Sequence, residues 1–487
     1  MTLPSRPLAS KFLTLVALAL WATAPAARLQ PLPGQTQNRP RPAARPVSVK
    51  KNIPYVDAKP ILEALRENLP GELTGKTPAE LESVWTGWVS RENAAIRARL
   101  EDGDEDSIVY LWQYGTSFTK QPAVTERNVA SLGGASAAET IIQNRLEDFI
   151  AGIASPGANE RLQFARRVIE RKGINPTTLS GKDQVRRHLR DARARVLAEL
   201  DKNERALESA KQLGDPNAEL ATYLTLFRER GLSSDTSVLP AFAIEQALET
   251  IKAQGMLGAG SVRRVAIVGP GLDFANKADG YDFYPQQTIQ PFAAIDSLIR
   301  LGLAKPGELR LTTLDLSPRV NQHIEAARQR TRGGSSYMLH LPLSGEEPWN
   351  PAVVEYWQRL GDRIGTQGEA LTAPPGAGTI RVRAVRVNPA VVTSIVPRDL
   401  NIVLERLEPL ATDERFDLVI ATNILVYYDV FEQSLALVNV ARMLRPGGLF
   451  LSNTPVPPIP LMKLSARYTS LSYSDRQRDF MFWYQRQ

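Results

Sequence analysis

The fold of this chain is indicated most clearly by one stretch, Phe416-Asp-Leu-Val-Ile-Ala-Thr-Asn-Ile-Leu-Val-Tyr-Tyr-Asp429. Its apolar residues 418–421 predict a buried strand, and residues 430–444 predict an amphipathic helix directly after it. Thr422 and Asn423 stand between the two as the polar residues of the crest. Because ligands of open α/β sheets bind at the carboxyl ends of parallel strands, we expect a site at this crest.

Two earlier segments repeat the pattern of a strand followed by residues suited to a ligand. Residues 263–268 predict a strand that leads into Gly269-Pro-Gly271, where the missing Cβ atoms let a ligand approach the backbone. Residues 309–314 predict a second strand that ends in Asp315. A carboxylate in that position is suited to accept hydrogen bonds from ribose hydroxyls, so the pattern predicts a nucleotide-type cofactor.

Three motifs of the C-terminal half carry a family resemblance: Phe416-Asp-Leu-Val-Ile420, Asn423-Ile-Leu-Val-Tyr427 and Leu444-Arg-Pro-Gly-Gly-Leu449. Over roughly its last half the chain resembles class I S-adenosylmethionine (SAM) methyltransferases, and these motifs are most similar to those of chemotaxis-receptor (CheR-like) glutamate methyltransferases. The resemblance implies a Rossmann-like α/β domain at residues 255–487 and SAM as cofactor. It also implies two terminal strands that close as an antiparallel hairpin on the sheet edge.

The resemblance assigns cofactor-binding roles to several residues. Gly269 and Gly271 would let the methionine portion of SAM approach the backbone, and Asp273 would meet its ammonium group or a nearby water. Asp315 would bind the ribose, since we expect Ser317 to serve as the cap of the helix that follows. Asn388 would hold the adenine if residues 379–388 form the inner third strand, for which residues 337–343 are the other candidate.

The crest supplies the expected catalytic residues. Asn423 would orient cofactor or acceptor, and Tyr427 and Tyr428 would line the methyl channel. One tyrosine would deprotonate the acceptor if its pKa were depressed, although packing is the favoured reading for both. Asp429 and Glu432 match a capping box, which predicts that Asp429 begins the helix. The resulting hypothesis is a SAM-dependent methyltransferase acting on an unidentified oxygen or nitrogen acceptor.

Two other functions stay open at this point. An exported, catalytically degenerate methyltransferase fold, acting as a binding or scaffolding module, is favoured by the predicted signal peptide because SAM is made in the cytoplasm. Ile267 also favours it, because many relatives carry an acidic residue there. A nicotinamide-dependent Rossmann enzyme is disfavoured, since Phe274 stands where the dinucleotide fingerprint has its third glycine.

The N-terminal part of the chain has a different organisation. Residues 1–26 combine basic residues, an apolar run and a small-residue cleavage point, which predicts a signal peptide and export to the periplasm or medium. Its apolar run is shorter than the roughly 20 residues of a membrane span. Residues 27–53 predict a proline-rich, disordered linker, and residues 54–254 predict an all-helical domain.

Composition narrows the chemistry. The net charge of +7, from 59 basic and 52 acidic residues among 487, is too small an excess to indicate nucleic-acid binding. The absence of cysteine excludes disulfides and thiolate ligands, and the three histidines have no metal-binding spacing, so no metal is expected. The acidic residues 102–106 depart from a calcium loop and are interpreted as an acidic turn. Oligomeric state and acceptor are not indicated.

Overall fold

The computed structural model describes residues 48–125, 128–212, 222, 226–228, 230–273, 281–344, 348–377, 380–475 and 477–487. The chain divides into two compact units, residues 1–46 and 47–487, and all described residues belong to the second. The predicted signal peptide at 1–26 and most of the predicted linker lie outside the described residues, so both stay predictions. None of the described helices is both long enough and apolar enough to cross a membrane.

The second unit alternates helices and strands. The helices are α1 (Tyr55–Ala64), α2 (Pro78–Tyr114), α3 (Ala135–Ala154), α4 (Glu160–Arg171), α5 (Leu179–Gln212), α7 (Pro240–Ala253), α8 (Gln290–Arg300), α9 (Pro318–Arg332), α10 (Pro351–Arg359), α11 (Pro389–Ser394) and α12 (Val430–Met443), with 3-10 turns η1 (Arg66–Asn68), η2 (Pro375–Ala377), η3 (Thr412–Glu414) and η4 (Leu425–Tyr427). The strands are β1 (Val49–Asn52), β2 (Asp235–Thr236), β3 (Arg264–Val268), β4 (Leu272–Asp273), β5 (Arg310–Asp315), β6 (Tyr337–Pro342), β7 (Gly365–Gly368), β8 (Val382–Val387), β9 (Ile395–Asp399), β10 (Glu405–Glu408), β11 (Phe416–Ala421), β12 (Leu444–Ser452), β13 (Met462–Ser472) and β14 (Arg478–Arg486).

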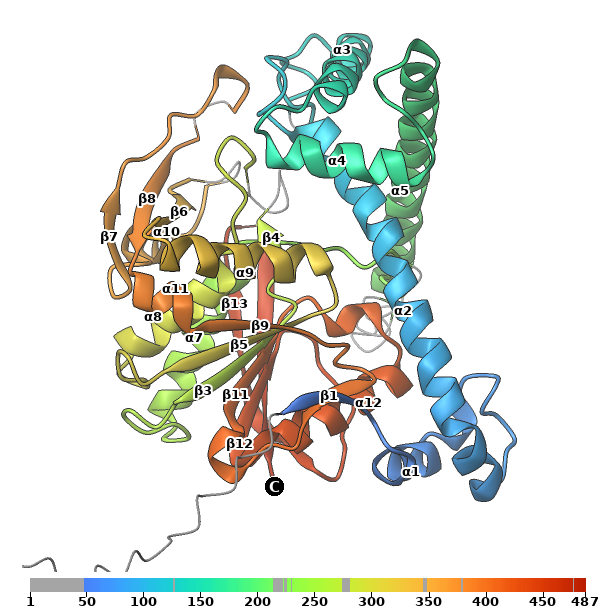
Figure 1. Ribbon diagram of the computed structural model, residues 1–487, viewed down its shortest axis with the longest axis vertical. Coiled ribbons are helices and arrows are strands. Elements are labelled where there is room, and N and C mark those ends of the chain that lie inside the picture. The colour runs from blue at the N-terminus through green and yellow to red at the C-terminus, as the bar shows by residue number, and fades with distance from the viewer. Residues whose placement is uncertain are drawn as a thin grey trace, which may run out of the picture. The chain divides into compact units, whose positions relative to one another are not determined.

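In the described part of the chain, the main sheet has seven strands in the order β13-β14-β12-β11-β3-β5-β9 (Figure 1). The strands from β12 to β9 are parallel to their neighbours, and β14 is antiparallel to both β12 and β13. The antiparallel hairpin predicted for the sheet edge is therefore confirmed. The parallel order also brings the carboxyl ends of β3, β5 and β11 together at one edge of the sheet.

The third strand is β9, so the prediction that residues 337–343 or 379–388 form it is wrong. Those two segments contain β6 and β8, which pair antiparallel with each other in a separate sheet with β7. The short helix α11 connects β8 to β9. Asn388 begins α11 and accepts a hydrogen bond from the Ala390 backbone N–H at 3.0 Å, so it caps a helix and does not stand at a tip of the main sheet.

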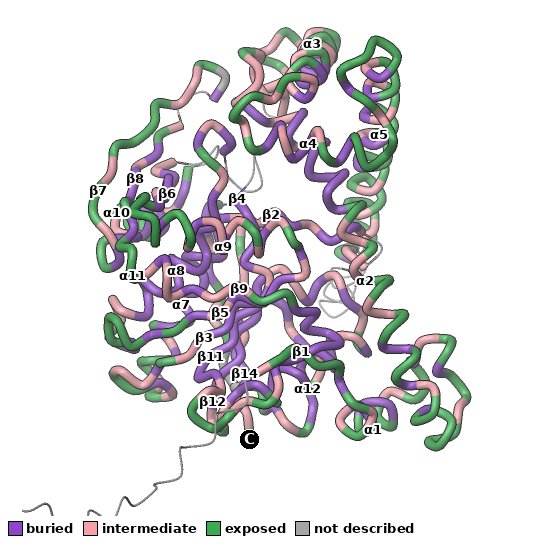
Figure 2. Tube along the Cα trace, in the orientation of Figure 1, coloured by how far each residue is buried: buried purple, intermediate pink, exposed green. Residues whose placement is uncertain are grey.

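Helices cover both faces of the main sheet, because alternate strand residues point to opposite sides. On β3, Ile267 joins a core cluster with Phe242 of α7, whereas Val268 joins a second cluster with Leu435 of α12 and Trp88 of α2. Figure 2 shows the buried residues running through the central strands. The second cluster joins a helix of the predicted all-helical segment to the sheet, and an independent domain at 54–254 stays a prediction.

The segment before the sheet also contains strands. Val49–Asn52, predicted as the end of the linker, forms β1 and pairs antiparallel with β10. The two-residue strand β2 pairs parallel with β4, just after the glycine turn. Long helix α2 runs along one side of the unit, next to α5 (Figure 1).

The acidic residues 102–106 lie inside α2, so the predicted acidic turn is wrong. A Cβ atom on Gly103 would lie 1.9 Å from the backbone oxygen of Leu232, so glycine lets the chain pass against this helix. Asp104 and Asp106 are buried and pair with Arg171 and Arg195 at 2.6 Å each. Ion pairs with distant arginines stabilise acids that would otherwise favour a solvated turn.

Two buried charged residues, Asp282 and Arg161, hold the helical segment to the loop after β4, and we call them the clamp. The Asp282 carboxylate accepts hydrogen bonds from Thr116 N (2.6 Å), Thr116 Oγ1 (2.7 Å), Ser117 N (3.0 Å) and Ser117 Oγ (2.6 Å). The Arg161 guanidinium donates to backbone oxygens of the same loop, including those of Asp282 (3.2 Å) and Tyr284 (2.5 Å).

We expect Asp282→Asn to lower the free energy of unfolding by about 2–4 kcal/mol, because the new amide NH₂ would face the two donors of Ser117. Urea unfolding followed by circular dichroism measures the change. Asp201→Asn on the exposed side of α5 is the matched control and should change stability by less than about 0.5 kcal/mol. Equal effects of the two substitutions would contradict the clamp.

Candidate functional site

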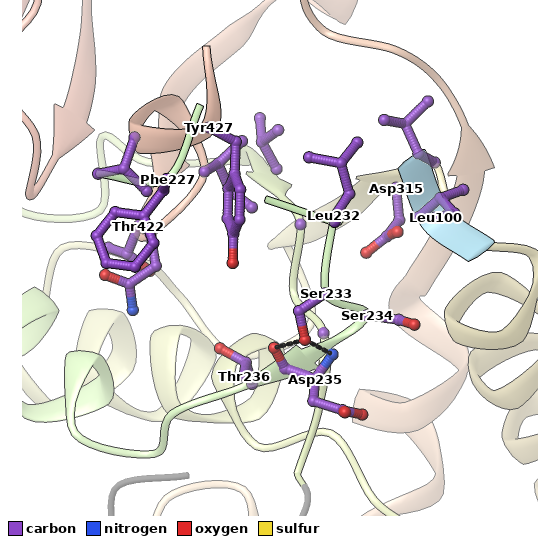
Figure 3. A pocket seen from close by; sticks show the side chains of 18 of the residues that line it. Leu100, Phe227, Leu232, Ser233, Ser234, Asp235, Thr236, Asp315, Thr422 and Tyr427 are labelled. Carbon is purple, nitrogen blue, oxygen red and sulfur yellow. Dashed lines mark hydrogen bonds between the residues drawn. The ribbon is translucent and has the colours of Figure 1, made fainter. Parts of the chain in front are cut away.

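A cavity of about 540 Å³ lies at the carboxyl ends of β3, β5 and β11. Its walls are the glycine turn after β3, the end of β5 and the crest after β11, and residues 230–237 together with side chains of α2 close it (Figure 3). The predicted site residues that line it are Gly269, Gly271, Asp315, Asn423, Tyr427 and Tyr428. The structure thus brings together residues from three separate strand ends.

The glycine turn is shaped by the protein itself. Gly269 and Gly271 both have φ of +61°, a left-handed backbone that favours glycine. A Cβ atom on Gly269 would lie 2.1 Å from Cδ1 of Ile424, and one on Gly271 would lie 2.7 Å from Cβ of Thr236. Glycine is therefore required at both positions whether or not a ligand approaches the turn.

Asp315 is buried at the end of β5 and lines the cavity. One carboxylate oxygen accepts a hydrogen bond from the Ser317 backbone N–H at 2.7 Å. Burial raises the pKa of Asp315 to about 7 against the opposing backbone hydrogen bonds of Ser317 and Gly271, and the charge of Asp399 raises it further. Ser317 is the N-cap residue of α9 and is followed by proline in the first turn, as expected, but its side chain makes no capping hydrogen bond.

The crest after β11 is held by side chains from neighbouring elements. Asn423 adopts a left-handed φ of +58°, which asparagine tolerates better than most residues. Its backbone N–H donates to Asn453 Oδ1 at 2.8 Å, and its Oδ1 accepts from Asn453 Nδ2 at 2.7 Å. Thr422 Oγ1 accepts from Gln290 Nε2 at 2.6 Å. These bonds fix the bend that presents Asn423 to the cavity.

The two tyrosines of the crest are suited to packing and hydrogen-bond donation. Burial raises the pKa of Tyr427 and also that of Tyr428, which opposes the predicted role of either one as a base. The guanidinium of Arg99 lies 5.8 Å from the ring centroid of Tyr428. The predicted capping box is confirmed, because Asp429 Oδ1 accepts from Glu432 N at 2.8 Å and Glu432 Oε2 accepts from Asp429 N at 2.9 Å.

Asp273 and Asn388 do not line this cavity. Asp273 is fully buried, and its Oδ2 accepts hydrogen bonds from the Tyr284 hydroxyl at 2.6 Å and from Gln287 Nε2 at 2.8 Å. Burial raises the pKa of Asp273 to about 6. Its predicted contact with the cofactor's ammonium group therefore has no support in this arrangement.

Within the described ranges, no group of three or more His, Asp or Glu side chains is placed to hold a metal ion.

The closing side of the cavity was missed by the sequence analysis. Its residues are Leu100, Asp106 and Tyr110 of α2, Phe227, and residues 230–237. β2 belongs to this segment, and it lies beside the glycine turn because it pairs with β4. The run Ser233-Ser-Asp-Thr-Ser237 has no periodicity that indicates a strand, and its polarity is the one signal that it offers.

Comparisons with known proteins give distant similarities only. No family model and no curated protein matches the chain. Magnesium protoporphyrin IX methyltransferase (ChlM) from Synechocystis PCC 6803, solved with bound SAM, matches 51% of this chain and 79% of its own at 9% identity and a TM-score of 0.25. TrmN from Thermus thermophilus matches 51% and 52% at 11% identity and a TM-score of 0.24. The glycopeptide N-methyltransferase MtfA, solved with SAM, matches 49% and 64% at 13% identity and a TM-score of 0.19.

These three solved structures concern the fold of about half of the chain. Because the identities and TM-scores are this low, these structures say nothing about the site of this chain. Its fold is defined by the order and direction of its own strands. None of the three is named as a chemotaxis-receptor methyltransferase, so that narrower resemblance has only the sequence motifs behind it.

We expect Gly271→Ala to cost more stability than Gly269→Ala. Both substitutions should cost about 1–2 kcal/mol of stability because of the left-handed φ. The new Cβ of Gly269→Ala would meet Ile424 Cδ1, the end of a side chain that can rotate. That of Gly271→Ala would meet Thr236 Cβ, which is fixed by β2. Urea unfolding of both variants measures the difference. Gly302→Ala, at φ of +68° with open space around it, isolates the backbone cost. If all three variants lose the same free energy, the contacts around the turn are not limiting.

Proposed function

We propose that the cavity binds SAM and that the protein transfers the methyl group to an oxygen or nitrogen acceptor. One observation carries the proposal: Gly271, Asp315 and Asn423, predicted separately as cofactor residues, line one cavity at the carboxyl edge of the parallel strands. The antiparallel hairpin of β13 and β14, expected from the methyltransferase resemblance, supports it. A cavity of this volume suits a molecule of cofactor size.

The residues of the cavity fit such a cofactor. A carboxylate has about four lone-pair sites. Among the described residues, Asp315 uses them for backbone groups of Ser317 and Gly271, which leaves acceptor capacity for ribose hydroxyls. Bound SAM would supply an activated methyl group on a sulfonium. The chain's own part is to hold cofactor and acceptor in line, which accounts for the rigid crest at Asn423 and the fixed glycine turn.

Two narrower predictions are retained as proposals supported by sequence alone. Export through a signal peptide at residues 1–26 is the first, and the CheR-like similarity of the late motifs is the second. Neither identifies the acceptor.

We expect the folded protein to bind SAM and S-adenosylhomocysteine with micromolar Kd and to prefer both over NAD. Asp315→Asn should weaken adenosyl-ligand binding at pH 8 by about tenfold to a hundredfold, because it removes a charged hydrogen-bond acceptor. Isothermal titration calorimetry at pH 6, 7 and 8 measures both. Affinity of the wild-type protein should rise with pH up to about 7, the pKa at which Asp315 ionises, and the variant should lose this dependence.

Asp201→Asn should leave binding and its pH dependence unchanged. A folded wild-type protein that binds neither adenosyl ligand would overturn the proposal. Preferential NAD binding would instead support a nicotinamide-dependent enzyme.

The same substitution should raise stability at pH 8. The folded-state pKa of Asp315, about 7, lies above the ordinary value of 3.8, so the folded state binds its proton more tightly. The stabilisation of the folded state by this tighter proton binding is fully present below about pH 4 and is lost as the pH rises through 7. Asp315→Asn removes the cost of ionising a buried acid, on the order of 1–4 kcal/mol. Urea unfolding should show the gain at pH 8 and none at pH 4, and a loss of stability at pH 8 would contradict it.

A further inference from the structure

The side-chain amide of Asn423 is held in one orientation by Asn453, the residue that follows β12. The backbone N–H of Asn423 can only donate, so the atom that accepts from it at 2.8 Å must be Oδ1 of Asn453. The other polar atom of Asn453 is then Nδ2, which donates to Asn423 Oδ1 at 2.7 Å. One backbone group therefore determines the orientation of both amides.

Asp479 of β14 supports the same orientation from the other side of Asn453. Its Oδ2 lies 3.4 Å from Asn453 Nδ2 and accepts a hydrogen bond from the Tyr473 hydroxyl at 3.1 Å. Its Oδ1 accepts from the Phe480 backbone N–H at 2.8 Å. A carboxylate favours a donor at the nearest amide atom, because its own oxygens accept. Asn453 thus stands between a group that donates and a group that accepts.

The NH₂ group is the part of the Asn423 amide that is left for a ligand. Asn423 lines the cavity and is half-buried. Its Nδ2 makes no hydrogen bond with any described residue, and the atom itself is not buried. The crest therefore offers a hydrogen-bond donor to the cavity. The opposite orientation of the amide would offer an acceptor, so the contact with Asn453 decides which kind of ligand atom fits beside Asn423.

The position of the crest relates this donor to the reacting end of the proposed cofactor. The proposed function, on which this inference rests, gives Asp315 of β5 to the ribose and the turn after β3 to the methionine portion. β3 lies between β5 and β11 in the sheet. The crest after β11 borders the turn, because a Cβ atom on Gly269 would lie 2.1 Å from Ile424 Cδ1. The sulfonium joins the ribose and methionine portions, which brings its methyl group next to the crest.

We propose that Asn453 is a positioning residue that turns the NH₂ group of Asn423 toward the methyl acceptor and thereby selects oxygen over nitrogen. An amine nitrogen has one lone pair, which the methyl group takes, and its N–H groups would face those of Asn423. A deprotonated oxygen has several lone pairs. One accepts from Nδ2 while another forms the O–CH₃ bond, and the electron pair of the broken C–S bond stays on sulfur. This step needs no base, in keeping with Tyr427 and Tyr428, whose pKa values are raised by burial.

Sinefungin and S-adenosylhomocysteine test this orientation. Sinefungin has a protonated amine, a donor, where SAM has its methyl group, and S-adenosylhomocysteine has no donor there. The double variant Asn453→Asp with Asp479→Asn conserves charge and should turn the Asn423 amide over, because the new carboxylate accepts from Nδ2 and repels Oδ1. We expect its affinity for sinefungin, relative to S-adenosylhomocysteine, to rise at least about tenfold over wild type. Isothermal titration calorimetry measures both ligands.

Asn423→Gly is the matched background, because glycine keeps the left-handed φ of +58° and removes the amide. In this background the double variant should change the relative affinity by less than about twofold. Asn423→Gly alone should raise relative sinefungin affinity, since it removes the opposing donor.

An unchanged relative affinity in the double variant would overturn the inference, as would an equal rise in the Asn423→Gly background. Should the double variant fail to fold, Asn423→Gly decides, because the absence of a rise there also overturns it. A folded wild-type protein that binds neither adenosyl ligand refutes the proposed function instead.

Discussion

The clamp between Asp282 and Arg161 is the interaction on which the arrangement around the cavity depends. Asp282 receives four hydrogen bonds from Thr116 and Ser117, next to the end of α2, and Arg161 of α4 donates to the backbone of the loop that carries Asp282. Each charge is buried and is satisfied by hydrogen bonds across the two segments, so loss of these bonds leaves a buried charge without compensation. The clamp therefore fixes the helical segment to the sheet through the loop that follows β4.

A second contact brings the helical segment to the cavity itself. Arg99 of α2 donates to the backbone oxygens of Arg228 (2.8 Å), Arg230 (3.0 Å) and Tyr427 (3.0 Å). One guanidinium thus joins α2, the segment that closes the cavity and the crest after β11. Gly103 and Gly231 make this close approach possible. A Cβ on Gly103 would collide with the backbone of Leu232, and a Cβ on Gly231 would collide with the backbone of Gly103. The cavity is therefore lined by residues of both the helical segment and the sheet.

Within the parallel part of the main sheet, apolar runs predicted β3 and β11 from the sequence, whereas β9, which has no such run, was missed. The runs Val265–Val268 of β3 and Leu418–Ala421 of β11 are buried, so they are continuously apolar and the crest residues follow directly. β9 reads Ile395-Val-Pro-Arg-Asp399, and its proline is tolerated because β9 pairs on one side only. The error on Asn388 follows from this strand. Asp106 was beyond prediction, because its burial depends on Arg195 and Arg230, which are distant in sequence.

The two walls of the cavity come from different parts of the chain and obey different constraints. On the sheet side, strand register and the left-handed turns fix the backbone, so few substitutions in the turns are compatible with the fold. On the helical side, Tyr110 and Phe227 contribute side chains, whose replacement leaves the strand ends in place. Proteins that share a fold differ in function mainly through the side chains of their sites. Under the proposed function, the sheet side of the cavity holds the cofactor, and the helical segment supplies the side chains that can vary with the acceptor.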